Sequence, residues 1–280
     1  MDGGFLLPSL FLAHGSPTLA LEGGAWGRRL GGLGEALRNI RGVLVCSAHW
    51  ETPEGFRVTA ADPPRTIHDF GGFPEPLYAL EYPAPGDPAL ARRVSDLLGE
   101  VGETVQADPG RGLDHGAWVP LLHLFPEARV PVVQLSLPRS RTPQRIWAAG
   151  RALAPLRDEG ILILGSGGLV HNLARLDWTG AEGPPSWAEA FEGWILDRLA
   201  SPDPASAMDW SGAPGAALAV PSTEHLDPLW LALGAGSGAP MNTLFKGWQL
   251  GSLSLRSLAF LAAGEGEADP VARFIEGEAG

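Results

Sequence analysis

The sequence has 280 residues, of which 45% are hydrophobic, and such a chain can bury the core of one large α/β domain. Its formal net charge of -12 makes nucleic acid and anionic membrane surfaces unfavourable partners, because both are negatively charged. A single cysteine, Cys46, excludes an intramolecular disulfide framework and a thiolate cluster for zinc. Any bound metal must therefore be held by His, Asp or Glu side chains.

The N-terminal segment is unlike a secretory signal. It is apolar, but its leading charge is acidic rather than basic and Pro8 interrupts it early. No later run reaches the roughly 18 apolar residues that span a bilayer. We expect a cytoplasmic protein that binds neither nucleic acid nor membrane.

Short apolar runs alternate with helical stretches along the chain. Four runs have strand length and lack strict polar alternation, as in buried strands of a parallel sheet: residues 10–13, 43–47, 132–137 and 161–164. Four stretches place apolar residues three or four apart and predict helices: residues 88–98, 118–125, 143–157 and 186–199. We predict the α/β class, with one catalytic domain over residues 1–280: a layered sandwich with a central, largely parallel (mixed) sheet flanked by helices.

Two further features concern turns and the C-terminal part. Two short strands are expected around a turn at residues 249–251, and the acidic residues 264–280 are expected to form a loosely ordered tail. The glycine pairs at 71–72 and in GSGG at 165–168 match no phosphate-binding loop. We expect them to allow tight turns and a close backbone approach to a pocket.

Five of the seven histidines fall where a predicted strand ends or a helix begins. His14 ends the run LFLAH, His49 ends VLVCSAH, and His171 follows ILILGSGGLV; His115 precedes a helix and His225 approaches another. Open α/β sheets bind ligands at the carboxyl ends of their strands, so we expect these imidazoles to converge there on a metal ion. The alternative is that each is a polar loop residue bonded to nearby backbone, which the repetition of the pattern disfavours.

The other candidates are less specific. His68 either lines the mouth of the pocket or is an ordinary loop residue, and His123 is expected to be a packed or surface residue of its helix. Glu224 is a possible further ligand, and Asp114 is a candidate to orient His115 through a ring N–H. Both acids can equally be solvated loop residues.

Six strings resemble the class III extradiol ring-cleavage dioxygenases, specifically the 4,5-DOPA dioxygenase-like group. They occur in family order over nearly the whole chain: FLAHGSPT, SAHWE, TIHDFGGFP, GLDHGAWVPLLHLFPEARVPVVQLSL, GSGGLVHNL and STEHLDPLWLALGA. The resemblance implies that His14, His49 and His225 bind the metal. It implies that His171 is an acid/base beside the open coordination positions and a metal ligand when substrate is absent, and that His115 hydrogen-bonds the substrate or an oxygen intermediate.

The resemblance also implies a reaction, with some alternatives open. Protocatechuate-cleaving members of the superfamily have a glutamate ligand where this chain has His225, and three imidazoles suit Zn(II) as well as Fe(II). We expect Fe(II) in the active form, although the isolated protein can contain Zn. The expected substrates are a catechol and O2. His171 is expected to transfer the proton, and His115 to stabilise negative charge. A 2-aminophenol substrate, a zinc hydrolase and a non-catalytic metal-binding scaffold are the alternatives; the oligomeric state is left open.

Overall fold

The computed structural model describes residues 6–179, 183–261 and 270–276, and within them an eight-stranded mixed sheet dominates. The strand order is β4-β3-β5-β2-β6-β1-β10-β7. The strands are β1 (Ser9–Ala13), β2 (Gly42–Thr52), β3 (Phe56–Thr59), β4 (Val105–Asp108), β5 (Val132–Pro138), β6 (Ile161–Gly167), β7 (Met241–Phe245) and β10 (Ser257–Phe260).

Four neighbouring strands in the middle of the sheet, β5, β2, β6 and β1, run parallel. Antiparallel pairing begins where β10 joins β1 on one side and where β3 joins β5 on the other. The predicted α/β class with a largely parallel, mixed sheet is therefore confirmed. Because the four parallel strands point the same way, their carboxyl ends meet at one edge of the sheet.

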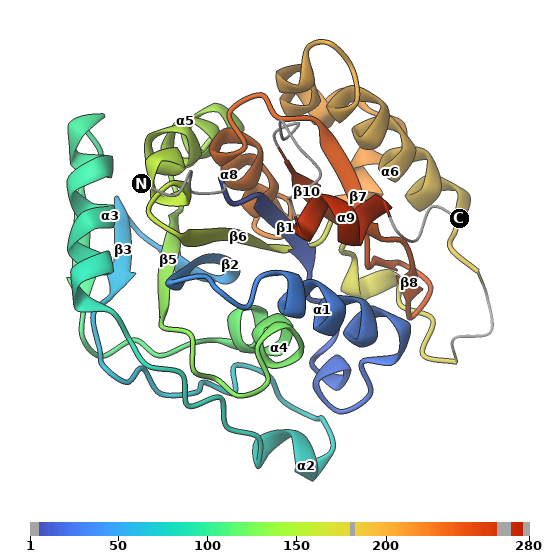
Figure 1. Ribbon diagram of the computed structural model, residues 1–280. Helices are drawn as coiled ribbons and strands as arrows, with labels where there is room; N and C mark the ends of the chain where they lie inside the picture. The colour runs from blue at the N-terminus through green and yellow to red at the C-terminus, as the bar shows by residue number, and fades with distance from the viewer. Residues whose placement is uncertain (1–5, 180–182, 262–269, 277–280) are drawn as a thin grey trace.

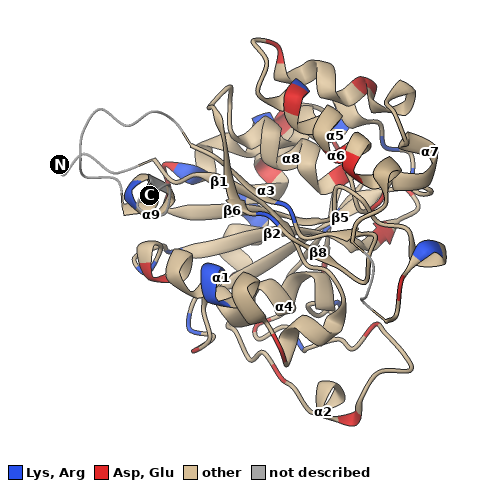
Figure 2. Cartoon of the chain, turned by 90° about the vertical axis from the view of Figure 1, so that its right-hand side faces the viewer, with Lys and Arg blue, Asp and Glu red and all other residues tan. Residues whose placement is uncertain are grey.

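Helices cover both faces of the sheet, as Figures 1 and 2 show. Side chains alternate along β2: Val43 and Val45 pack into a core with α1 and α4, whereas Leu44 and Cys46 pack into a second core with α3, α5, α6 and α8. The helices are α1 (Gly24–Ala36), α2 (Glu75–Tyr78), α3 (Pro88–Glu100), α4 (His115–Leu124), α5 (Pro143–Leu153), α6 (Ser186–Leu199), α7 (Ala216–Ala219), α8 (Asp227–Ala235) and α9 (Pro270–Glu276). Burial on both faces explains why the strand runs are continuously apolar.

Two of the predicted helices differ from the observed ones in physically simple ways. Helix α4 begins at His115, three residues before the predicted start, because Asp114 caps it by accepting a hydrogen bond from the Ala117 N–H. Helix α5 ends at Leu153 and continues as a 3-10 turn, Ala154–Arg157, which contains Pro155. Short 3-10 segments also occur at Pro17–Ala20, Leu173–Arg175 and Pro204–Gly212.

The C-terminal part combines predicted and unexpected structure. Strands β8 (Trp248–Gln249) and β9 (Leu253–Ser254) pair in antiparallel fashion around the expected turn. Within the predicted tail, Pro270–Glu276 forms α9, whose Val271 is fully buried in the core beside α1; residues 264–269 and 277–280 lie outside the described residues. No helix in the described ranges is long and apolar enough to cross a membrane.

Candidate metal centre

The five singled-out histidines come together at the carboxyl edge of the parallel strands. His14 follows β1 directly, His171 follows β6 by four residues, His115 opens α4 and His225 lies two residues before α8. His49 lies inside β2 rather than at its end, which corrects the prediction. There the pairing of β2 with β5 shifts register between Cys46 and Glu51, so the strand is irregular around this histidine.

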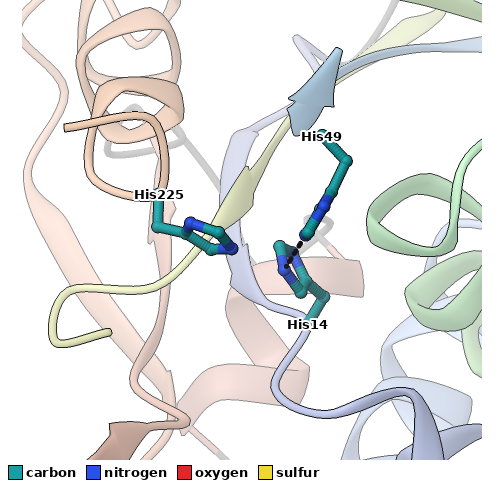
Figure 3. Close-up of side chains that lie close together, drawn as sticks. All are labelled: His14, His49 and His225. Atoms are coloured by element: carbon teal, nitrogen blue, oxygen red, sulfur yellow. Dashed lines mark hydrogen bonds between the residues drawn. The ribbon is translucent and has the colours of Figure 1, made fainter. Parts of the chain in front are cut away.

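Three of these imidazoles form one group that can hold a metal ion. One ring nitrogen from each of His14, His49 and His225 lies within 4.8 Å of the other two. The ring centroids are 4.9 to 5.2 Å apart, and the Nε2 atoms of His14 and His49 are separated by 3.1 Å. Figure 3 shows the three rings pointing toward one another from three separate segments of the chain.

The second nitrogen of each ring is held by an oxygen atom. Ser166 donates its hydroxyl proton to the Gly116 carbonyl, so it accepts from His14 Nδ1 at 3.0 Å. Glu224 Oε1 accepts from His225 Nδ1 at 3.0 Å, and Asp69 Oδ2 lies 3.4 Å from His49 Nδ1. With Nδ1 protonated in each ring, all three Nε2 atoms present lone pairs to the same point.

Burial favours the same neutral state. Burial, and after it the neighbouring histidines, holds the pKa of His14 and of His225 well below the ordinary imidazole value. The same two causes, in the same order, lower the pKa of His49 and His171 to about 4. Near neutral pH these rings are uncharged, with one ring nitrogen protonated and a lone pair on the other, which is the form that binds a metal ion.

One atom of the group lacks a hydrogen-bond partner among the described residues. His225 Nε2 is buried and makes no hydrogen bond to any described residue. A buried polar atom of this kind costs roughly 1–3 kcal/mol unless it is satisfied. A cation bound between the three rings would accept the lone pair of His225 together with those of His14 and His49, so the residues present fit a metal ion.

The glycine-rich end of β6 sets the position of His225. A side chain on Gly167 would collide with the backbone oxygen of His225, and one on Gly165 with that of Pro228. The Gly168 N–H also donates to the His225 carbonyl at 2.8 Å. The expected close backbone approach is confirmed for residues 165–168, and it brings His225 against β6. It is wrong for Gly71 and Gly72, where an added side chain would meet nothing within 4 Å.

Asp69, which the sequence reasoning missed, is the carboxylate that orients His115. Its Oδ1 accepts from His115 Nδ1 at 3.0 Å and from the His115 N–H at 2.8 Å. Burial alone would raise the pKa of Asp69, but the hydrogen bonds and charge of His115 lower it to about 2. Asp69 stands next to His68 in the motif TIHDFGGFP, and membership of that motif is the one sequence feature that could have identified it.

Asp114 has a different task from the one predicted. It is fully buried, caps α4, accepts from Ser47 Oγ at 2.7 Å and pairs with Arg111 at 2.8 Å. It therefore anchors the start of α4 rather than the ring of His115.

The two remaining histidines lie outside the group. His68 Nε2 donates to the Leu80 carbonyl at 2.9 Å, and its ring packs against those of Phe70 and Trp118. It does not line the cavity described below. His123 lies within α4 and donates to the Leu19 carbonyl at 2.8 Å, as expected for a packed helix residue.

A cavity of about 620 Å³ opens beside His14, His49 and His225, which together are called the metal group. His49, His115, His171 and His225 line it together with Asp69 and Glu224, and the rest of the lining is mainly apolar, with three neutral polar side chains. Its volume suits a substituted aromatic ring.

An α/β sandwich that brings buried histidines able to hold a metal ion against a ligand cavity has the arrangement of a metal-dependent enzyme. The family model described as the catalytic LigB subunit of aromatic ring-opening dioxygenase matches residues 8–259, and the chain belongs to this family. It is thus an extradiol aromatic ring-opening dioxygenase, as the sequence motifs predicted.

Individual relatives agree with this assignment. The chain is 41% identical over 256 residues to "4,5-DOPA dioxygenase extradiol" of Escherichia coli (strain K12), covering 90% of this chain and 94% of that protein. It is 38% identical over 258 residues to the protein of the same name from Beta vulgaris, covering 90% and 96%. A crystal structure of an uncharacterised Escherichia coli K12 protein superposes with a TM-score of 0.78 at 36% identity, covering 91% of this chain and 99% of that one.

Proposed function

We propose that this dioxygenase opens the ring of a catechol with O2 at a single Fe(II) ion held by His14, His49 and His225. The observation that carries the proposal is the convergence of three Nε2 lone pairs, one of which is buried and makes no hydrogen bond within the part of the chain that the structure describes. The names of the two curated relatives support a catechol, because DOPA carries an adjacent pair of ring hydroxyls.

The metal would supply adjacent coordination positions for the two oxygens of the diol and for O2. Fe(II) is favoured over Zn(II) because ring opening by O2 needs a redox-active ion. In the overall reaction the bond beside the diol breaks, and both atoms of O2 enter the product. One oxygen atom appears in an aldehyde and the other in a carboxylic acid, so no further oxidant or reductant is consumed.

His171 is proposed to move the proton. It lines the cavity and its ring is neutral near pH 7, so it can accept a proton from a substrate hydroxyl and return it later. The role of a fourth metal ligand in the absence of substrate also stays a prediction for this residue. In the structure, one ring nitrogen of His171 lies within 4.8 Å of ligand atoms of Glu224 and His225, and it does not belong to the group formed with His14 and His49.

His115 is proposed to stabilise negative charge on the bound substrate or on oxygen. Because Asp69 accepts from Nδ1, a proton gained at Nε2 is stabilised by the ionised carboxylate and can be donated toward the cavity. The His115 ring lies 4.0 Å from that of His49, which places the donor next to the metal group.

Anaerobic loading with Fe(II), followed by oxygen-electrode measurements on a panel of catechols and 2-aminophenols, tests the proposal. Oxygen uptake matched by a yellow semialdehyde product supports it, and the panel separates the two substrate classes. Activity restored by Zn(II) without oxygen uptake would instead identify a hydrolase. Tight metal binding with no turnover of any compound would identify a scaffold. Residence in the cytoplasm stays a prediction of the sequence.

A further inference from the structure

The outer part of the cavity is apolar. Phe70, Phe73, Leu173, Leu176 and Trp178 line it beyond the histidines. Leu173 is 62% exposed and Trp178 is 70% exposed, and both rank among the few large apolar side chains that the described residues expose. Exposed apolar side chains that border a cavity are best explained by a ligand that covers them.

The charges that line this cavity are negative. They are the carboxylates of Asp69 and Glu224, each of which holds a histidine ring. None of the described residues that line it is Lys or Arg, and the residues outside the described ranges contain neither type. Arg175 lies between two lining residues in the sequence, but its side chain is exposed and does not line the cavity.

The three neutral polar side chains of the cavity wall, those of Ser16, Asn172 and Ser222, make hydrogen bonds within the protein. Ser16 Oγ accepts from Thr18 Oγ1 at 3.2 Å. Asn172 donates to the Leu218 carbonyl at 2.8 Å, and its amide oxygen accepts from the Ala174 N–H at 3.0 Å. Ser222 donates to Glu224 Oε1 at 2.9 Å. An anionic group on a ligand would therefore lose water without gaining a positively charged partner.

A second cavity, which adjoins the first, has an arginine in its lining. Arg139 lines a second space of about 460 Å³, which meets the first at His49, Glu224 and His225. None of the apolar residues of the outer wall lines this second space. The residues of the metal group therefore lie between Arg139 and the apolar wall. Whether Arg139 binds a carboxylate substituent is tested below with the variant Arg139→Gln.

We propose that the preferred substrate carries an uncharged, apolar substituent that lies against Leu173, Leu176 and Trp178, and that catechols with a carboxylate substituent are disfavoured. The inference rests on the proposed function in one respect, namely that the diol binds at the histidine group. It goes beyond that function because it names the substituent and the wall that selects it.

Three catechols with the same number of heavy atoms separate charge from size: 4-isobutylcatechol, 3,4-dihydroxyphenylacetamide and 3,4-dihydroxyphenylacetate. Titration calorimetry on Zn(II)-loaded protein under nitrogen measures their binding without any turnover. We expect the isobutyl compound to bind most tightly and the carboxylate to bind roughly tenfold or more weaker than the amide. The diol occupies the metal ion, and no Lys or Arg among the lining residues pairs with the carboxylate. DOPA, added as a fourth ligand, is expected to bind less tightly than 4-isobutylcatechol.

One pair of variants at Leu173 and a single variant at Arg139 show where the selection is made. Leu173→Arg should strengthen binding of the carboxylate relative to the amide by roughly tenfold, whereas the uncharged control Leu173→Gln should leave that ratio unchanged. Arg139→Gln should also leave the ratio unchanged. Because both positions are exposed, the variants are expected to fold, and a melting curve checks this.

The outcomes separate this inference from the proposed function. A carboxylate that binds as tightly as the isobutyl compound overturns the inference, and a selective loss of carboxylate binding in Arg139→Gln would assign the substituent to the second cavity. The predicted binding order combined with no oxygen uptake by the Fe(II)-loaded protein supports the inference and overturns the ring-opening function. Oxygen uptake that follows the same order supports both.

Discussion

The ring of His171 is stacked on the ring of His225, with the centroids 3.4 Å apart and the planes inclined by 6°. The backbone N–H of His171 donates to the Ala219 carbonyl at 2.9 Å, which fixes the segment that carries it. His171 is therefore held beside a proposed ligand without belonging to the group of three nitrogens. Its contribution to chemistry can be separated from its contribution to metal binding.

We expect His171→Gln to retain most of its iron and to lose roughly a hundredfold or more in turnover, the usual scale of general acid/base assistance. Substrate affinity should change less. Iron content and oxygen uptake measured on one preparation check both points. Loss of the iron would make His171 an essential ligand and move the proton transfer to His115. Retention of iron with near-normal oxygen uptake would remove both roles.

The second prediction concerns the three proposed ligands. Replacing His14, His49 or His225 by Ala leaves two imidazoles, and we expect each variant to lose metal during gel filtration while His123→Gln retains it. The reason is that metal affinity depends on the number of converging ligands, and His123 donates to backbone elsewhere. The measurement is the metal content of each variant after gel filtration in chelator-free buffer. Full occupancy in any of the three Ala variants would contradict the assignment.

The positions of these ligands show what the sequence can and cannot predict. His14 was placed correctly because an apolar run ends directly before it, and His225 because a Pro-containing helix start follows. His49 was placed at a strand end, but β2 continues to Thr52 because it pairs again with β5 after its parallel pairing with β6 stops at Ser47. Renewed pairing after a register shift leaves no mark on local hydrophobic periodicity.

The selection of three ligands from five histidines could not be derived from spacing. His14 and His225 are far apart in the chain, and only the packing of α8 against β6 brings them together. The family resemblance supplied that assignment. Asp69 was missed for a related reason: it lies in a loop with no regular structure, where no period marks which side chain faces inward.

The third prediction contrasts the two aspartates. Asp69→Asn removes the charge that faces His115, so we expect turnover to fall roughly 10- to 100-fold, the usual effect of altering a group that orients an active-site imidazole. The melting temperature should change little. Asp114→Asn should instead destabilise the fold by about 3 kcal/mol, because it breaks a buried pair with Arg111.

Steady-state oxygen uptake and thermal melting, measured on both variants, test the contrast. If Asp114→Asn lowered turnover without affecting melting while Asp69→Asn did neither, Asp114 would be the orienting carboxylate suggested by the sequence alone.

The last prediction concerns the packing that carries His225. Helices α5 and α8 approach each other at two glycines: a side chain on Gly150 would collide with the Leu231 carbonyl, and one on Gly234 with the Trp147 carbonyl. Both obstacles are backbone atoms, so the helices must separate to accommodate a methyl group. We expect Gly150→Ala to destabilise the protein by about 1–3 kcal/mol, the usual cost of overpacking.

Gly99→Ala is the matched control, because Gly99 lies in α3, is exposed, and has nothing within 4 Å of the added methyl group. Alanine is the better helix former, so this variant should be more stable by up to about 1 kcal/mol. Denaturant unfolding measures both changes. Since α8 follows His225 by two residues, Gly150→Ala should also weaken metal retention, whereas Gly99→Ala should not. Equal stability of the two variants would mean that α5 and α8 can separate without cost, and that their packing does not fix His225.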